Sequence, residues 1–129
     1  MTENAIATII VDAAFKIHKT LGPGLLESVY EAALKHELQK RGLKVLQQLR
    51  IPVAYEGLDL GIGFRADLVV NDKVVIEIKS IEALAAVHSK QLATYLRLMD
   101  RRLGLLINFN VELIRNGIRR VVNQLVESS

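Results

Sequence analysis

The spacing of the apolar residues changes from a helical to a strand-like pattern at Gly42, and that change constrains the fold more than any other feature. Before Gly42 they recur every three or four residues, as on the buried face of a helix. After it, outside one further helical stretch, they alternate with polar residues or form short continuous runs, as in strands. A chain of 129 residues is long enough for one core and too short for two independent ones. The sequence therefore predicts a single α/β domain over residues 1–129.

Two helices are predicted in the first third of the chain. The first covers residues 4–21, where apolar side chains recur at helical spacing and Thr2 or Asn4 can cap the N-terminus. The segment Gly22-Pro23-Gly24 ends it. The second covers residues 27–40 and is followed by a glycine where glycine is favoured. We expect the two helices to form an α-hairpin.

The remainder is predicted to form strands around one further helix. Four strands form an antiparallel meander, and a helix then crosses over to a strand that is buried on both faces. The Asn116-Gly117 pair predicts a hairpin that adds edge strands. The predicted strands are residues 45–55, 58–64, 66–70, 74–78 and 103–108, the helix is 87–100, and the hairpin lies within 113–122.

Composition limits the kinds of metal site that this domain can carry. There is no cysteine, so disulfides and thiolate ligands are excluded. Any metal would be held by oxygen or histidine ligands. Oxygen ligands favour Mg²⁺ or Mn²⁺ as the cofactor.

Charge and the N-terminal segment constrain the partners and the location. The 17 Lys and Arg against 14 Asp and Glu leave a formal charge of +3, which allows phosphate binding without arguing for it. The N-terminus has only a short apolar run and no basic leader, which indicates neither a signal peptide nor a membrane span. We therefore expect a cytoplasmic protein with no membrane partner.

The segment Val74–Ser80 carries the first candidate functional residues. Side chains alternate along a strand, so Glu77 and Lys79 project to one face while Ile76 and Ile78 project to the other. An isolated pair of this kind is more often the solvated face of an amphipathic strand. A second carboxylate nearby is needed before the pair indicates a site.

Asp67 supplies that carboxylate from the preceding strand. It lies between apolar residues, where an unpaired charge is costly and a bound cation would remove the cost. A two-residue Asn71-Asp72 turn would pair Asp67 with Ile76 and put Asp67 and Glu77 on opposite faces. We therefore predict an odd-length loop such as residues 71–73, or a bulge, that puts both carboxylates on one face.

This arrangement would suit one hard cation. The carboxylates of Asp67 and Glu77, with the backbone carbonyl of Ile78, could hold one Mg²⁺ and leave positions for water and a phosphate oxygen. Lys79 could then orient or deprotonate the attacking water.

The helix after these strands offers further candidates. Gln91 and Tyr95 lie four residues apart on one helix face and could cover the same cleft. Alternatively, Tyr95 packs among apolar neighbours and Gln91 is a surface residue. His88 is a secondary candidate for a phosphate contact, although a lone histidine near a helix start is more often a polar cap.

Glu27 and Tyr30 open the second predicted helix. A carboxylate in the first turn suits the helix dipole, which alone would explain Glu27. Tyr30, one turn later, is expected in the core with its hydroxyl on a polar partner.

With these residues in place, the chain resembles the GxxExxY family, a branch of the PD-(D/E)XK nuclease superfamily. The resemblance covers about residues 10–122. Arg65-Ala66-Asp67 replaces the Pro-Asp of the superfamily's name, but the proline is not a ligand. The resemblance rests on Gly24, Glu27 and Tyr30, on Asp67 with Glu77-Ile78-Lys79, and on Gln91 through Tyr95.

The resemblance implies a restriction-endonuclease-like α/β core, with a central mixed sheet flanked by helices. It also implies a divalent-metal site that cuts phosphodiester bonds in DNA or sometimes RNA. By the same resemblance, Asp67 and Glu77 bind metal and Lys79 assists water. Glu27 would be an acidic residue from an upstream helix that acts as an extra metal ligand or as a contact to a metal-bound water, and Gln91 with Tyr95 would match a QxxxY helix.

Three functional hypotheses follow. The first is a Mg²⁺- or Mn²⁺-dependent nuclease that acts on nucleic acid, with DNA as the expected substrate. The second is a non-catalytic nucleic-acid or protein-binding module that keeps the fold and grips phosphate through Lys79, Arg65 and Lys90. The third, compatible with both, is a homodimer formed through an exposed strand edge or an apolar helix face.

Overall fold

The first forty residues form the two predicted helices. In the computed structural model, which describes residues 1–126, α1 spans Glu3–Leu21 and α2 spans Glu27–Lys40. The hydroxyl of Thr2 caps α1 by accepting a hydrogen bond from the Ala5 amide at 3.1 Å. Gly22 ends α1 with a φ of 73°, a left-handed conformation that favours glycine.

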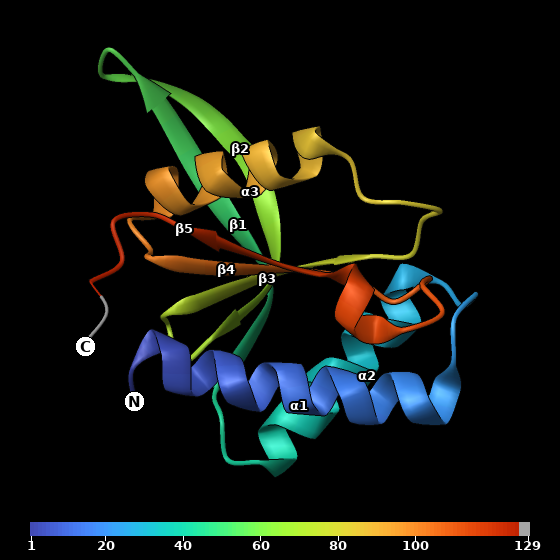
Figure 1. The fold of residues 1–129 in the computed structure, drawn as a ribbon. Helices are drawn as coiled ribbons and strands as arrows, with labels where there is room; N and C mark the ends of the chain where they lie inside the picture. The colour runs from blue at the N-terminus through green and yellow to red at the C-terminus, as the bar shows by residue number, and fades with distance from the viewer. Residues whose placement is uncertain (127–129) are drawn as a thin grey trace.

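A five-stranded mixed sheet forms the centre of the molecule (Figure 1). The strands lie in the order in which they occur in the chain, and only the β3–β4 pair is parallel. The helix α3, Ala86–Met99, is the crossover between those two strands. The strands are β1 Val45–Tyr55, β2 Leu58–Val70, β3 Val74–Lys79, β4 Leu103–Asn108 and β5 Ile118–Val122. The α/β fold with a mixed sheet flanked by helices is confirmed.

Two of the predicted strand details are wrong. Residues 58–64 and 66–70 form one continuous strand, β2, rather than two. The Asn116-Gly117 pair makes no hairpin, because the residues before it form a loop and a 3₁₀ helix, η1 Ile114–Gly117, rather than a strand. The tail therefore adds a single edge strand, β5, which pairs with β4.

The sheet separates two hydrophobic clusters of unequal size. Figure 1 shows α1 and α2 on one face and α3 on the other. The larger cluster lies between the two N-terminal helices and the sheet, and the smaller one lies under α3. At Gly104 of β4, an added Cβ would come within 2.9 Å of the Leu92 side chain on α3, so glycine lets this helix lie close to the sheet.

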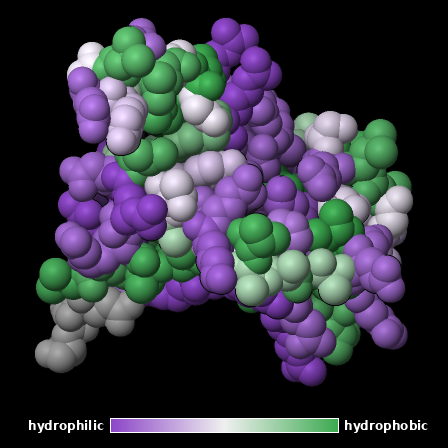
Figure 2. Space-filling model, turned by 90° about the horizontal axis from the view of Figure 1, so that it is seen from above, coloured by the Kyte–Doolittle hydropathy of each residue, from purple (hydrophilic) through white to green (hydrophobic). Residues whose placement is uncertain are grey.

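Beyond α3, β1 and β2 continue as a two-stranded arm, at the upper left of Figure 1. Register shifts near Pro52 break the regular pairing of the arm. Tyr55, Leu58, Leu60 and Ile62 are each more than half exposed there. On the face shown in Figure 2, polar groups separate the hydrophobic ones, so no single apolar patch dominates it. Within residues 1–126, no helix is long and apolar enough to cross a membrane.

Candidate functional site

The loop between β2 and β3 sets the register of the candidate carboxylates. Val70 pairs with Val74 and Leu68 with Ile76, so the loop is the three residues 71–73. Asn71 and Asp72 have φ of 50° and 57°, in the left-handed region that these residue types tolerate. The predicted odd-length loop is confirmed. The register, continued by one residue, brings Asp67 opposite Glu77.

Side-chain hydrogen bonds replace the β-ladder at this point. The amide of Ile78 donates to Oδ2 of Asp67 at 2.8 Å, and the amide of Asp67 donates to Oε1 of Glu77 at 3.3 Å. Backbone pairing between β2 and β3 stops at Leu68, so the two strands separate where the carboxylates lie. The structure therefore brings Asp67 and Glu77 into direct contact.

The environment of Glu77 opposes a negative charge there. Glu77 is only 8% exposed to solvent. Burial, and then the negative charge of Asp67, raise the pKa of Glu77 from 4.5 to about 8. The positive charge of Lys79 lowers that pKa by a smaller amount. Within residues 1–126 the Lys79 ammonium has no hydrogen bond or ion pair, so it remains available to a ligand.

Tyr95 lies beside the two carboxylates, over the sheet face that α3 covers. Its ring stacks on Phe64 of β2, with 3.9 Å between the ring centroids. Burial, followed by the charges of Glu77 and Asp67, raises the pKa of the Tyr95 phenol. Tyr95 is thus both a packing residue and a neighbour of the carboxylates. Gln91, one turn earlier, is exposed.

His88 caps the N-terminus of α3, which is the usual role of a lone histidine near a helix start. Its Nδ1 accepts a hydrogen bond from the Ala85 amide at 2.8 Å. This contact gives His88 a local structural role at the start of the helix.

The start of α2 reaches the end of β3. Oε2 of Glu27 accepts a hydrogen bond from the Ser80 amide at 3.2 Å, one residue after Lys79. The Ser80 hydroxyl donates to the Leu25 carbonyl at 2.6 Å. Glu27 therefore lies at the rim of the site, beside a hollow of about 410 Å³ that Ser80 and Leu25 help to line.

Tyr30 stabilises the turn between α1 and α2 through its hydroxyl group. It is fully buried and stacks on Phe109, with 4.5 Å between the ring centroids. Its hydroxyl donates to the Gly22 carbonyl at 2.6 Å and accepts from the Leu25 amide at 3.1 Å. The expected core role of Tyr30 with a polar partner is confirmed.

Sequence reasoning missed three polar residues near the site. Glu31 of α2 and Gln48 of β1 are joined by a hydrogen bond, and Gln48 also bonds Asp67. Asn108 is fully buried at the end of β4, and its amide group bonds the backbone of Ile81, in the loop that follows β3. A polar residue that ends an otherwise apolar run was the available signal for Asn108. Glu31 and Gln48 are identified only by the packing of α2 on the sheet, which brings them together.

The residues present fit a hard divalent cation in their chemistry. Ile78 directs its amide toward Asp67 of β2, and because the N–H and C=O of a strand residue point to the same side, its carbonyl also points toward β2. A cation would also relieve the repulsion between Asp67 and buried Glu77. Within residues 1–126, no three Asp, Glu, His or Cys side chains group closely enough to hold a metal by themselves. Glu27 therefore does not join Asp67 and Glu77 in one side-chain cluster.

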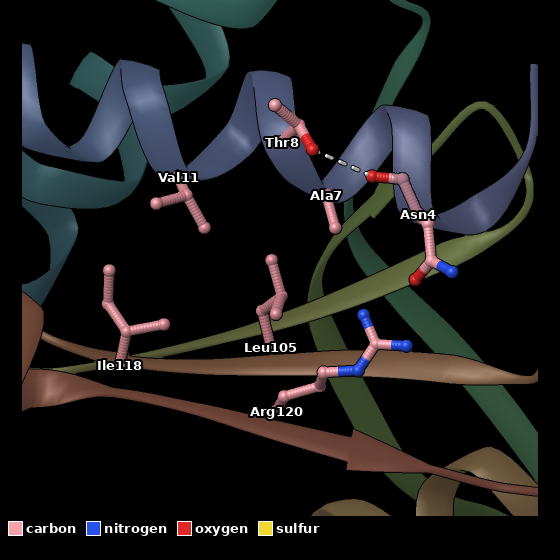
Figure 3. A pocket seen from close by; sticks show the side chains of 7 residues that line it. All are labelled: Asn4, Ala7, Thr8, Val11, Leu105, Ile118 and Arg120. Atoms are coloured by element: carbon pink, nitrogen blue, oxygen red, sulfur yellow. Dashed lines mark hydrogen bonds between the residues drawn. The ribbon is translucent and has the colours of Figure 1, made fainter.

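A larger hollow lies elsewhere, between α1 and the strands β4 and β5 (Figure 3). Its volume is about 710 Å³, and the side chains of Asn4 and Arg120 point into it. It has no carboxylate or histidine in its lining. Glu77 and Lys79 project from the opposite face of the sheet, so the larger hollow is not the candidate site.

Comparison with known families adds one finding to this geometry. A family model described as the PD-(D/E)XK nuclease superfamily matches residues 4–121. The matched segment includes the carboxylates of β2 and β3, the helix α3 and the start of α2. Among curated protein sequences, no significant match was found.

Proposed function

The chain belongs to the PD-(D/E)XK nuclease superfamily, and from that premise we propose that it is a Mg²⁺- or Mn²⁺-dependent nuclease that hydrolyses phosphodiester bonds, with DNA as substrate. We further propose that it belongs to the GxxExxY branch. The contact between Asp67 and buried Glu77 carries the proposal. The neighbouring carboxylates of Asp67 and Glu77 repel each other and would repel a phosphate, and a cation between them makes the arrangement favourable for a nucleic-acid ligand. A binding module without metal would gain nothing from it.

In the proposed mechanism the metal-binding atoms come from two adjacent strands. The carboxylates of Asp67 and Glu77 and the carbonyl of Ile78 would hold the ion, and Glu27 of α2, at the rim of the site, would contact a water bound to it. A bound Mg²⁺ or Mn²⁺ supplies Lewis acidity and lowers the pKa of water. The backbone of β3 is held in place at Glu77 and Ile78, because the alternate side chains of this strand pack in the larger cluster on the other face of the sheet.

The remaining groups would act on water and phosphate. Lys79 shares the strand face of Glu77, where its ammonium can orient the attacking water and balance charge that develops on the phosphate oxygens. The phenol of Tyr95 and the amide of Gln91 can donate hydrogen bonds to the nucleic-acid backbone. Stacking on Phe64 fixes the ring plane of Tyr95 for this contact.

Metal titration followed by cleavage assays tests the proposal. Mn²⁺ and Mg²⁺ are titrated calorimetrically into the wild type, Glu77→Ala and Glu82→Ala, and each protein is then incubated with single- and double-stranded DNA and RNA. Glu82 is an exposed glutamate five residues from Glu77 and is the matched control. We expect the wild type and Glu82→Ala to bind metal and cut, and Glu77→Ala to do neither. A wild type that binds no divalent ion would overturn the proposal.

A further inference from the structure

Gln48 occupies an unusual place, between a buried carboxylate of α2 and the carboxylate of Asp67. We propose that Gln48 is a positioning residue that ties Asp67 to Glu31 and so fixes the orientation of the Asp67 carboxylate for metal binding. This inference rests on the proposed function for its purpose, while the link between the two carboxylates stands on the geometry alone.

The hydrogen bonds of Gln48 use both hydrogens of one amide group. Its Nε2 donates to Oε1 of Glu31 at 2.8 Å and to Oδ1 of Asp67 at 3.1 Å. A glutamine NH₂ group carries two donors, whereas its oxygen would be repelled by both carboxylates. The NH₂ end is therefore the end that fits between the two anions.

Glu31 is a firm anchor for this link. It is 9% exposed, and its second oxygen accepts a hydrogen bond from Nε2 of Gln47 at 2.6 Å. Tyr30, the residue before it, and Leu34, about one turn after it on α2, are fully buried in the larger cluster. The helix therefore holds Glu31 in place, and Gln48 transmits that position to Asp67.

The backbone at Gln48 departs from the strand in a way that serves the link. Gln48 has a φ of 52°, the left-handed conformation that non-glycine residues rarely adopt in a strand. The register leaves out Gln48 and Asp67, which lie opposite each other between the pairs Gln47–Leu68 and Leu49–Ala66. Strain of this kind is typical of functional sites.

Both strands change faces at this row. Leu68 packs in the cluster under α1 and α2, whereas Ala66, two residues away, packs in the cluster under α3. On β1, Gln47 bonds Glu31 of α2, and Leu49 packs on the α3 side. Two residues of a regular strand that are two apart share a face, so the chain turns over at Gln48 and Asp67. That reversal lets Asp67 contact Glu77 while Gln48 reaches Glu31.

The link leaves Asp67 able to bind a cation. Gln48 bonds Oδ1 and the Ile78 amide bonds Oδ2, so each oxygen has one hydrogen bond. A carboxylate has about four acceptor positions. The two bonds fix the plane of the carboxylate and leave lone pairs for a ligand.

Two variants of adjacent glutamines test the link. Gln48→Gly removes the amide and relieves the left-handed backbone, while Gln47→Ala removes a donor to Glu31 that does not touch Asp67. We expect Gln48→Gly to weaken Mn²⁺ binding by about 10- to 100-fold with an unchanged or higher Tm, and Gln47→Ala to weaken it by less than about 3-fold. Unchanged Mn²⁺ affinity in Gln48→Gly, or a large fall in Tm that accompanies the loss, would overturn the proposal.

A second measurement on metal-free protein separates this inference from the proposed function. The side-chain NH₂ signals of Gln48, assigned by their loss in Gln48→Gly, are followed by hydrogen exchange in the wild type, Asp67→Asn and Glu31→Gln. We expect slow exchange in the wild type and faster exchange in both variants, whether or not the protein cuts nucleic acid. Exchange in the wild type as fast as that of a solvated glutamine would overturn the link itself.

Discussion

The two faces of the sheet differ in what they bury. The face under α1 and α2 carries the larger hydrophobic cluster, with buried side chains from both helices and from four of the strands. The face under α3 carries a small cluster, and Glu77, Lys79 and Tyr95 lie beside it. The comparison indicates that one face supplies most of the stability and the other leaves room for charged groups. A site with unfavourable charges depends on stability from elsewhere in the fold.

The largest expected effect is a loss of stability from the face under α1 and α2. Ile10→Ala removes a fully buried side chain of α1 from the larger cluster and should lower the free energy of unfolding by about 2 to 5 kcal/mol. Denaturant unfolding measures this loss, and Leu46→Ala, at a part-exposed position, is the control. Mn²⁺ affinity of the folded protein should stay within about twofold of the wild type. A loss of Mn²⁺ affinity together with the loss of stability would contradict the conclusion that one face supplies stability and the other carries the site.

The next effect is a pH dependence of stability that originates at Glu77, on the face under α3. The pKa of Glu77 is raised from 4.5 to about 8 in the folded state, so between these values the folded protein holds a proton that the unfolded chain has released. The contribution of this group to stability is fully present below about pH 4.5 and is lost as the pH rises through 8. Metal-free wild type should therefore lose up to about 1.4 kcal/mol per pH unit across this window.

Glu77→Gln isolates that contribution, because its neutral amide does not titrate. Unfolding by denaturant is followed from pH 5 to 8.5 in the presence of a chelator. The difference in the free energy of unfolding between variant and wild type should grow in favour of the variant as the pH rises. If the free energy of unfolding of the two proteins changed with pH in parallel, burial would not raise the pKa of Glu77 in the folded state.

The smallest effect on stability concerns Tyr95. Tyr95→Phe keeps the stack on Phe64 and removes only the hydroxyl, so the free energy of unfolding should change by less than about 0.5 kcal/mol. Cleavage, in contrast, should fall by about tenfold or more if the hydroxyl donates to the reacting phosphate. Tyr55→Phe, on the exposed arm, is the control. Equal cleavage by all three proteins would reduce Tyr95 to a packing residue.

Much of this arrangement follows from short-range patterns. The two N-terminal helices, the crossover helix and the apolar strand 103–108 have nearly the predicted bounds, because each depends on spacing within a few residues. The requirement that Asp67 and Glu77 share a site was enough to predict the three-residue loop between β2 and β3. The Asn116-Gly117 prediction failed because a hairpin needs a strand on both sides, and the residues before this pair form a 3₁₀ helix instead.

The sequence by itself determined the element types and the candidates Asp67, Glu77 and Lys79, since alternation along a strand and loop length are local properties. Only the tertiary structure decided that Glu27 lies at the rim beside Ser80, and that Glu31 connects through Gln48 to Asp67. Those contacts join residues of α2, β1, β2 and the end of β3 that are distant in the chain. Their partners are chosen by how the helix packs on the sheet and by the row at which both strands change faces. No local spacing encodes that packing, because it depends on the fit of the whole core.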